Sequence, residues 1–167
     1  MDFTAPHSEA QLFDAARRGE VSALQAALAA GVPIDAANDK GFTALILVCY
    51  DNHLEAARFL LDAGANPNQQ DIAGNTALMG VSFKGYVEIA RLLIERGAGL
   101  NLQNGPGSTA LIYATMFGRH DLMRLLLDAG ADKDIQDGRG LTALQLAGQP
   151  GNEAARVLLS GAPQSEE

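Results

Sequence analysis

The sequence predicts an all-α solenoid of about five helix-turn-helix repeats joined by hairpin loops. Three observations lead to this prediction: glycines recur with a period of 33 residues, one glycine series opens a repeated Gly-x-Thr-Ala-Leu segment, and alanine and leucine dominate an apolar fraction of 47%. A fixed period of roughly 20–50 residues is typical of repeat architectures, in which each unit buries its apolar face only against its neighbours.

The first helix of each repeat after the first is predicted to begin after a turn of constant length. Glycine permits a positive φ in the turn, threonine is an N-cap whose hydroxyl accepts a backbone N–H, and the leucine two residues on is expected to be the first core residue. The turns read Gly41-Phe42-Thr43-Ala44-Leu45, Gly74-Asn75-Thr76-Ala77-Leu78, Gly107-Ser108-Thr109-Ala110-Leu111 and Gly140-Leu141-Thr142-Ala143-Leu144.

Two further series are predicted to end the helices, because glycine, and asparagine after it, tolerate the left-handed conformation found there. Between the two series, segments such as 87–94 space their apolar residues for one buried face, which predicts the second helix of each repeat. The first helices end at Gly19, Asn52, Gly85, Gly118 and Gly151, and the second at Gly31, Gly64, Gly97 and Gly130.

The period defines one domain, residues 8–161, with repeats near 8–37, 38–70, 71–103, 104–136 and 137–161. The first repeat lacks the turn before its helix, and Pro150 and Asn152 disturb the inter-helix turn of the last. Both are therefore expected to cover the ends of the stack. Residues 1–7 and 162–167 are predicted to be flexible tails.

Turn, helix, turn, helix and hairpin loop at this period resemble the ankyrin repeat over nearly the whole chain. The Ala-rich chain without a fused domain is similar to the small stand-alone bacterial members of that family. The usual Thr-Pro-Leu-His tetrapeptide here reads Thr-Ala-Leu followed by Ile46, Met79, Ile112 or Gln145. Loss of the proline removes a preset φ, so we expect softer repeats with the same fold.

The resemblance implies a protein-protein interaction module, such as an adaptor, an inhibitor or a chaperone-like accessory, and not an enzyme. Some relatives of this type accompany catalases and assist the peroxide response or haem delivery. An accessory protein of a catalase or another haem enzyme is therefore the alternative function. That role would need an axial ligand for haem, for which the sequence shows no motif.

Charge and composition narrow the partner class. The formal charge is −8, and no run of basic residues is longer than Arg17-Arg18, which argues against nucleic acid and anionic membranes. The N-terminus has no signal-peptide pattern, and no apolar stretch approaches the ~18–20 residues that span a bilayer. We therefore expect a cytoplasmic protein and a monomer.

Few residues point to catalytic or metal chemistry. His7, His53 and His120 fall at unrelated repeat positions, and no glycine-rich phosphate loop or carboxylate pair is present, so no metal, cofactor or catalytic residue is expected. His53 is expected to be structural, and the single cysteine, Cys49, an inert core thiol. A ligand-binding or enzymatic protein with an unrecognised pocket is the less favoured reading. Irregularities such as Asn52 argue against a consensus design.

The resemblance places the partner site on a concave face built from the ends of the first helices and the tips of the loops. Tyr50, Phe83 and Met116 form one column, 33 residues apart, at a position the fold leaves exposed. Aromatic anchors dominate interface energies, which favours binding; the competing interpretation buries Phe83 and Phe117 in the inter-repeat core. By register, the helix ends supply Arg17, Arg18, Tyr50, Asp51, Phe83, Lys84, Met116 and Phe117, and the loop tips supply Lys40, Phe42, Ile72, Asn75, Arg139 and Leu141.

Overall fold

The computed structural model describes residues 8–148 and 150–161, which form ten α-helices in consecutive pairs. The expected tails, 1–7 and 162–167, lie outside these residues. The first helices are α1 (Glu9–Arg18), α3 (Ala44–Tyr50), α5 (Ala77–Lys84), α7 (Ala110–Met116) and α9 (Ala143–Leu146). The second helices are α2 (Val21–Ala29), α4 (Leu54–Asp62), α6 (Val87–Glu95), α8 (His120–Asp128) and α10 (Glu153–Ser160).

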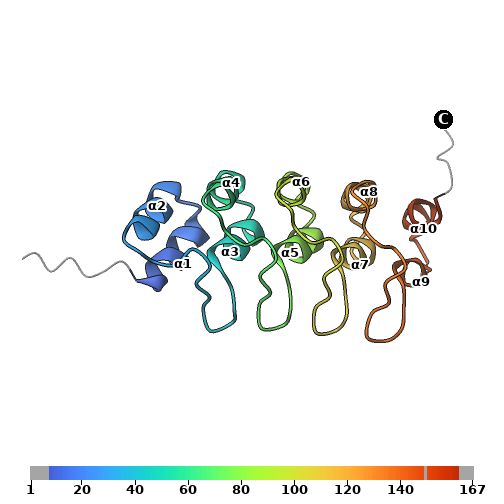
Figure 1. The fold of residues 1–167 in the computed structure, drawn as a ribbon. Coiled ribbons are helices and arrows are strands. Elements are labelled where there is room, and N and C mark those ends of the chain that lie inside the picture. The colour runs from blue at the N-terminus through green and yellow to red at the C-terminus, as the bar shows by residue number, and fades with distance from the viewer. Residues whose placement is uncertain (1–7, 149, 162–167) are drawn as a thin grey trace, which may run out of the picture.

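The pairs stack side by side in chain order, so the predicted all-α solenoid is confirmed (Figure 1). The second helices form one layer, the first helices form the other, and the hairpin loops project beyond the first helices (Figure 1). Each pair falls within one of the five expected repeat ranges. Among the described residues, bridge pairing of strand type is limited to Ala37 and Thr43, at the base of the first loop.

The first helices of the second to fifth repeats begin at the predicted threonine caps. In each case the threonine hydroxyl accepts the backbone N–H three residues on, as from Ile46 to Thr43 at 3.2 Å. Helix α1 has no such turn and begins instead with a capping box, in which Ser8 and Gln11 exchange side-chain and backbone hydrogen bonds. The first repeat therefore satisfies its helix start without a preceding turn.

The predicted helix-ending positions have positive φ. Gly85 ends α5 at φ 84°, and Asn52 takes the same register after α3 at φ 61°. Asparagine is the non-glycine residue that enters this region most readily, because its short side chain bonds locally. Asparagine at position 52, where the other repeats have glycine, therefore preserves the turn between α3 and α4.

The core runs along the stack between the two helix layers. Leu45, Leu78 and Leu111 are buried, as predicted for the second residue of each helix. The same prediction is wrong for Leu144, whose side chain is 44% exposed. Helix α9 belongs to the last pair, and within the described residues no further repeat packs against its outer side. Burial at this register therefore depends on a following repeat.

Side chains at a second register, 53, 119 and 152, tie three of the repeats to the repeat before them. His53 Nε2 donates to the Arg17 carbonyl at 2.8 Å, and Arg119 Nε donates to the Phe83 carbonyl at 3.1 Å. Asn152, at the same register, donates to the Thr115 carbonyl at 3.4 Å. These bonds satisfy carbonyls at the ends of first helices, which have no partner within their own helix. The structural role expected for His53 is confirmed.

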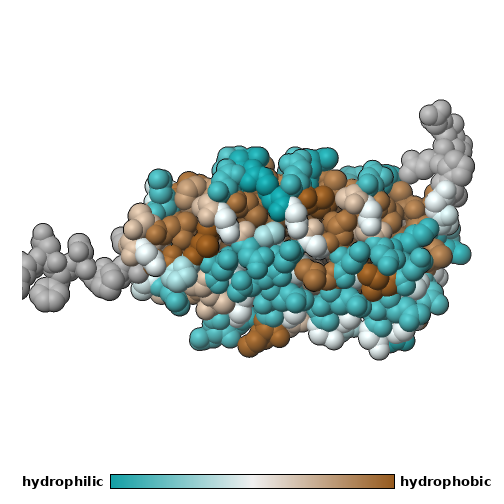
Figure 2. All heavy atoms as spheres, viewed as in Figure 1, coloured by the Kyte–Doolittle hydropathy of each residue, from teal (hydrophilic) through white to brown (hydrophobic). Residues whose placement is uncertain are grey.

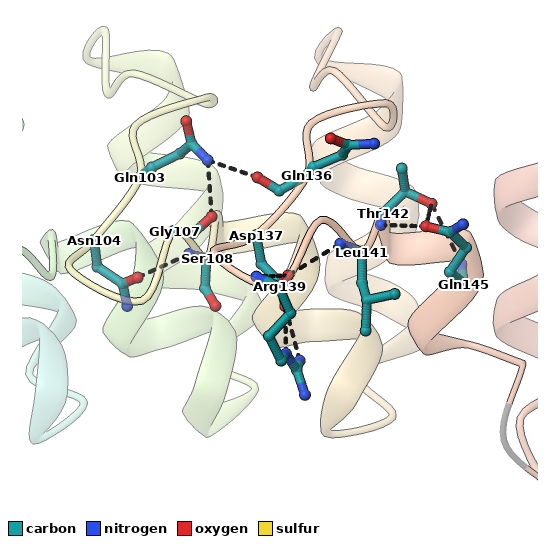
Figure 3. Close-up of polar contacts among 10 residues, drawn as sticks. All are labelled: Gln103, Asn104, Gly107, Ser108, Gln136, Asp137, Arg139, Leu141, Thr142 and Gln145. Carbon is teal, nitrogen blue, oxygen red and sulfur yellow. Dashed lines mark hydrogen bonds and ion pairs between the residues drawn. The ribbon is translucent and has the colours of Figure 1, made fainter.

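Polar side chains stiffen the hairpin loops. The amide or carboxylate oxygen of Asn38, Asp71, Asn104 or Asp137 accepts backbone N–H groups of its own loop, at 2.8–3.1 Å. Gln103 then bridges adjacent loops by donating to the Gly107 and Gln136 carbonyls, both at 2.9 Å (Figure 3). Backbone bonds join the loops as well, as from Gly138 N–H to the Pro106 carbonyl at 2.8 Å. The loops therefore form one connected row.

The single cysteine lies in the core, as expected. Cys49 is fully buried in α3, and desolvation raises the pKa of its thiol far above the ordinary value. A protonated, inaccessible thiol is unreactive. Separately, none of the helices in the described residues combines the length and apolar character needed to cross a membrane.

Candidate functional site: a concave groove with an aromatic cluster

A groove of about 980 Å³ crosses four repeats on the side where first helices meet the loops. Its lining combines helices α1, α3, α5 and α7 with the first two hairpin loops. A groove that extends across several repeats suits an extended chain segment better than a compact small molecule, because the latter is usually enclosed on most sides.

Eight of the fourteen predicted site residues line this groove. They come from the ends of first helices and from the first two loops, which is where register placed them. The eight are Arg17, Lys40, Phe42, Tyr50, Asp51, Asn75, Phe83 and Phe117. The structure thus brings together eight predicted residues from the first four repeats.

The groove contains an aromatic cluster, which we define as Tyr50, Phe83, Tyr113 and Phe117. The Phe83 and Phe117 rings meet edge to face with centroids 4.6 Å apart, and Tyr113 stacks on Phe117 with centroids 6.3 Å apart. Both geometries are favourable for aromatic pairs. Phe117, the residue after α7, therefore orients its two neighbours.

The Tyr113 ring is also fixed by a polar network. Asn104 Nδ2 donates to the Tyr113 hydroxyl at 2.9 Å and to Asn75 Oδ1 at 2.8 Å. Asn104 is buried, and its own Oδ1 accepts the Ser108 N–H. The network connects the second and third loops to α7, so Tyr113 is held in place before any partner arrives.

Tyr50 is held from a different direction. Its ring is 44% exposed, and Lys84 Nζ lies 4.6 Å from the ring centroid. A cation over an aromatic face is attracted by the ring quadrupole. Lys84 is a predicted site residue that does not line the groove, and the structure places it as a support for Tyr50.

The competing core interpretation for Phe83 and Phe117 is resolved differently for the two rings. Phe117 is 43% exposed. Phe83 is half-buried. Among the described residues, the half-buried side chains that pack against the core include Phe42 and Tyr113 but do not include Phe83. Phe83 therefore packs edge to face against Phe117, and neither ring is among the buried core residues.

The other predicted residues lie beyond the groove. Met116 is exposed, and Ile72, at the tip of the second loop, is 82% exposed. A hydrophobic patch stands among hydrophilic atoms at the loop tips on the face shown in Figure 2. Arg18 forms ion pairs with Asp14 and Glu20 at the end of α1.

Arg139 and Leu141 are engaged in holding their own loop. Arg139 Nη2 pairs with the buried Asp137 carboxylate at 2.8 Å, and the Leu141 N–H donates to the same side chain (Figure 3). The hydrogen bond from Arg139 lowers the pKa of Asp137 below its ordinary value. The fourth loop therefore lies outside the groove, and the Arg139 side chain and the Leu141 N–H bond within this loop.

Sequence reasoning missed several lining residues. Tyr113 and Gly80 share a register with Leu47 and were not among the predicted site residues. Phe13 of α1 also lines the groove. The lining also includes Asn38 and Asp71. Their 33-residue spacing, which Asn104 and Asp137 continue, was a signal that could have identified these two loop residues.

The charges of the groove are unevenly placed. Glu9, Asp39 and Asp51, together with Arg17 and Lys40, belong to the first two repeats, whereas the aromatic cluster extends to the fourth. Asp71 also lines the groove and uses its carboxylate to accept N–H groups of its own loop. The lining thus has four acidic and two basic side chains.

Among the described residues, no group of three or more His, Cys, Asp or Glu side chains is arranged to hold a metal ion. His53 is bonded to Arg17, and His120 lies at the start of α8, away from the groove lining. His7 lies outside the described residues.

Comparison with known proteins supplies the remaining finding. A family model of ankyrin repeats in three copies matches residues 12–104 and 83–166. The two ranges overlap and together reach all five helix pairs. No curated protein sequence matches the chain.

Proposed function

The chain belongs to the ankyrin-repeat family, and we propose that it binds a partner protein through the groove and its rim. Ankyrin repeats are generally protein-protein interaction modules and are generally not enzymes. The observation that carries the proposal is the aromatic cluster, which opens into the groove and is held by contacts within the chain.

The physical basis is the energy available from exposed aromatic side chains. Tyr50 and Phe117 leave a large part of their surface in water, so covering them releases hydrophobic free energy. Because Tyr113 and Phe117 are already stacked, and the Tyr113 hydroxyl already accepts a hydrogen bond, binding orders few additional side chains. A rigid apolar cluster of this kind favours affinity.

The predicted residues outside the lining form the rim in this proposal. Ile72, Met116 and Arg18 are exposed next to the groove, at loop tips and helix ends. A rim contributes less energy but excludes water from the centre. The hydrogen bonds between neighbouring loops hold the loop-tip part of the rim in one row.

The finer role of the binding is also proposed. We assign the chain to the cytoplasm as a monomeric adaptor, inhibitor or chaperone-like accessory, which its acidic composition and lone buried cysteine support. An accessory role toward a catalase or another haem enzyme is the alternative. Titration with haemin tests its haem-delivery form, because ligation would give a saturable shift of the Soret band.

The test of the main proposal compares two variants that each lose exposed apolar surface. Tyr50→Ser combined with Phe117→Ser removes two groove aromatics, and Val157→Ser removes a 38% exposed residue of α10, away from the groove. Affinity capture from native lysate, quantified by mass spectrometry, should recover the same partner with the parent and with Val157→Ser. The double variant should lose it while keeping its helical circular dichroism.

Equal recovery with all three proteins would refute the proposal. A double variant that melts far below the parent would be replaced by Phe117→Ser alone, whose ring lies after the end of α7 and contributes little to the core.

A further inference from the structure

Helix α5 contains a glycine that its backbone does not require. Gly80 lies in the middle of α5 and, unlike the turn glycines, is absent from the positive-φ residues. Glycine in a helix interior is less favourable than alanine by roughly 0.5–1 kcal/mol. Other repeats carry Leu47, Tyr113 and Leu146 at the same register. The fold therefore accepts a large side chain here, and the glycine leaves space.

That space opens into the groove. A Cβ atom built on Gly80 would have two described heavy atoms within 4 Å, both from the Tyr50 ring, the nearer at 3.3 Å. We define the Gly80 notch as the part of the groove lined by Tyr50, Met79, Gly80, Phe83, Tyr113 and Phe117. The Tyr50 ring lies in tight contact with the Gly80 position on one side, and the remaining space above the α5 backbone has mostly aromatic walls, so the notch suits an apolar side chain that enters from outside.

The charges beside the notch indicate what flanks that side chain. Asp51 directly follows Tyr50, and Glu9 and Asp39 lie further toward the first repeat. Within the described residues none of these three carboxylates forms an ion pair. Arg17 and Lys40 in the lining, and Lys84 over the Tyr50 ring, offset part of this charge, but the four carboxylates of the lining outnumber these three cations and the chain carries −8. The potential therefore favours a basic occupant.

Resting on the proposed function, we infer that the groove binds an extended, basic segment of the partner whose one large apolar side chain fills the Gly80 notch. Neighbouring first helices lie about 10 Å apart, and an extended chain advances about 3.3 Å per residue. A Lys or Arg about three residues from the apolar anchor then meets Asp51, and one about six residues away reaches Glu9.

The probe is a displayed library of random nonapeptides, selected on the immobilised parent protein. Enriched peptides should carry an aromatic or large aliphatic residue with Lys or Arg about three to six positions away on one side. The strongest one is then synthesised, and its Kd is measured by fluorescence anisotropy. Gly80→Leu, which places in α5 the residue found at this register in α3, should weaken binding at least tenfold while melting near the parent temperature, because the gain in helix propensity offsets the shift that the Tyr50 ring must make.

A double-mutant cycle tests the charge pairing. Asp51→Asn should weaken binding of the lysine-containing peptide about two- to fivefold, and should have no effect once that lysine is replaced by alanine. Asp128→Asn, which changes the net charge equally at the exposed end of α8, is the control and should have no effect on either peptide. Gly80→Ala serves if Gly80→Leu misfolds, with a smaller loss expected.

Three results would overturn the inference. The library could yield no enriched peptide, it could yield acidic or wholly polar peptides, or its peptides could bind Gly80→Leu as tightly as the parent. Acidic peptides could compete with the captured partner and lose their binding in Phe117→Ser. That result would leave the proposed groove function standing while refuting its basic occupant. A self-associating parent whose dimer Gly80→Leu dissociates would instead assign the groove to a second copy of the chain.

Discussion

Replacing Phe83 by alanine separates binding energy from folding energy in the groove. Full burial of a phenylalanine makes its truncation cost about 3–5 kcal/mol. Phe83 is only half-buried and forms an edge-to-face pair with Phe117, a geometry worth about 0.5–1.5 kcal/mol. We therefore expect Phe83→Ala to lower the free energy of unfolding by about 1 kcal/mol, and Tm by about 2–4 °C.

The matched control is Phe59→Ala in α4. Phe59 is also half-buried, but it packs against the core and lies outside the groove lining. Its truncation should cost about 2 kcal/mol, roughly half the value for a fully buried ring. Urea denaturation and thermal melting measure both variants. Partner or peptide affinity should fall about thirtyfold for Phe83→Ala and remain unchanged for Phe59→Ala.

A Phe83→Ala variant that loses about 3 kcal/mol or more would refute this reasoning, because such a loss requires a ring in the core. Unchanged affinity with a modest stability loss would also contradict it, since Phe83 would then be a surface residue without a binding role.

Other predictions follow from the helix packing and the turns. Leu78→Ala should cost about 2–5 kcal/mol in urea denaturation, whereas Leu144→Ala, at the same register but exposed, should cost about 1 kcal/mol or less. Gly85→Val should cost at least about 2 kcal/mol, because a β-branched residue resists positive φ; Gly85→Asn, which copies Asn52, should cost less, and equal melting temperatures would contradict this account. For Asp137, whose folded-state pKa is lowered, the carboxylate contributes stability above its unfolded pKa of about 3.9, and this contribution is lost as pH falls through the folded pKa. Asp137→Asn keeps the loop acceptor, so its stability difference from the parent should shrink below about pH 4 in melts taken from pH 7 to 2; a difference independent of pH would refute the charged role.

The period of the sequence was sufficient to predict the fold because each column has a local cause. Thr43 caps a helix through its own hydroxyl, and Asn52 ends one through its own backbone preference. Neither depends on distant residues. Leu144 shows where this reasoning fails: its burial depends on whether another repeat follows, and the residue itself is the same as Leu78.

The site was less predictable than the fold, since its shape arises from combinations of columns. Register placed Tyr50 and Phe117 in the groove, but the stacking of Tyr113 on Phe117 depends on Asn104, which lies in a loop nine residues earlier. The role of Gly80 depends on what other repeats carry at its register. Arg139 was expected at the binding surface and instead pairs with Asp137, because the geometry of a single loop decides where that side chain lies.

The loops separate two roles that most recognition loops combine. In the first two loops, the side chains of Asn38 and Asp71 set the loop shape, while Lys40 and Ala73, two positions later, contribute a backbone N–H to them. In the third loop that place is taken by Pro106, which has no N–H to give, and Asn104 still accepts the Ser108 N–H. The fourth loop differs, because the Arg139 guanidinium also bonds to Asp137. Side chains at the tips of the first three loops can thus change without altering the frame, and grafting new residues at 40, 73 and 106 should redirect recognition while leaving the melting temperature near that of the parent.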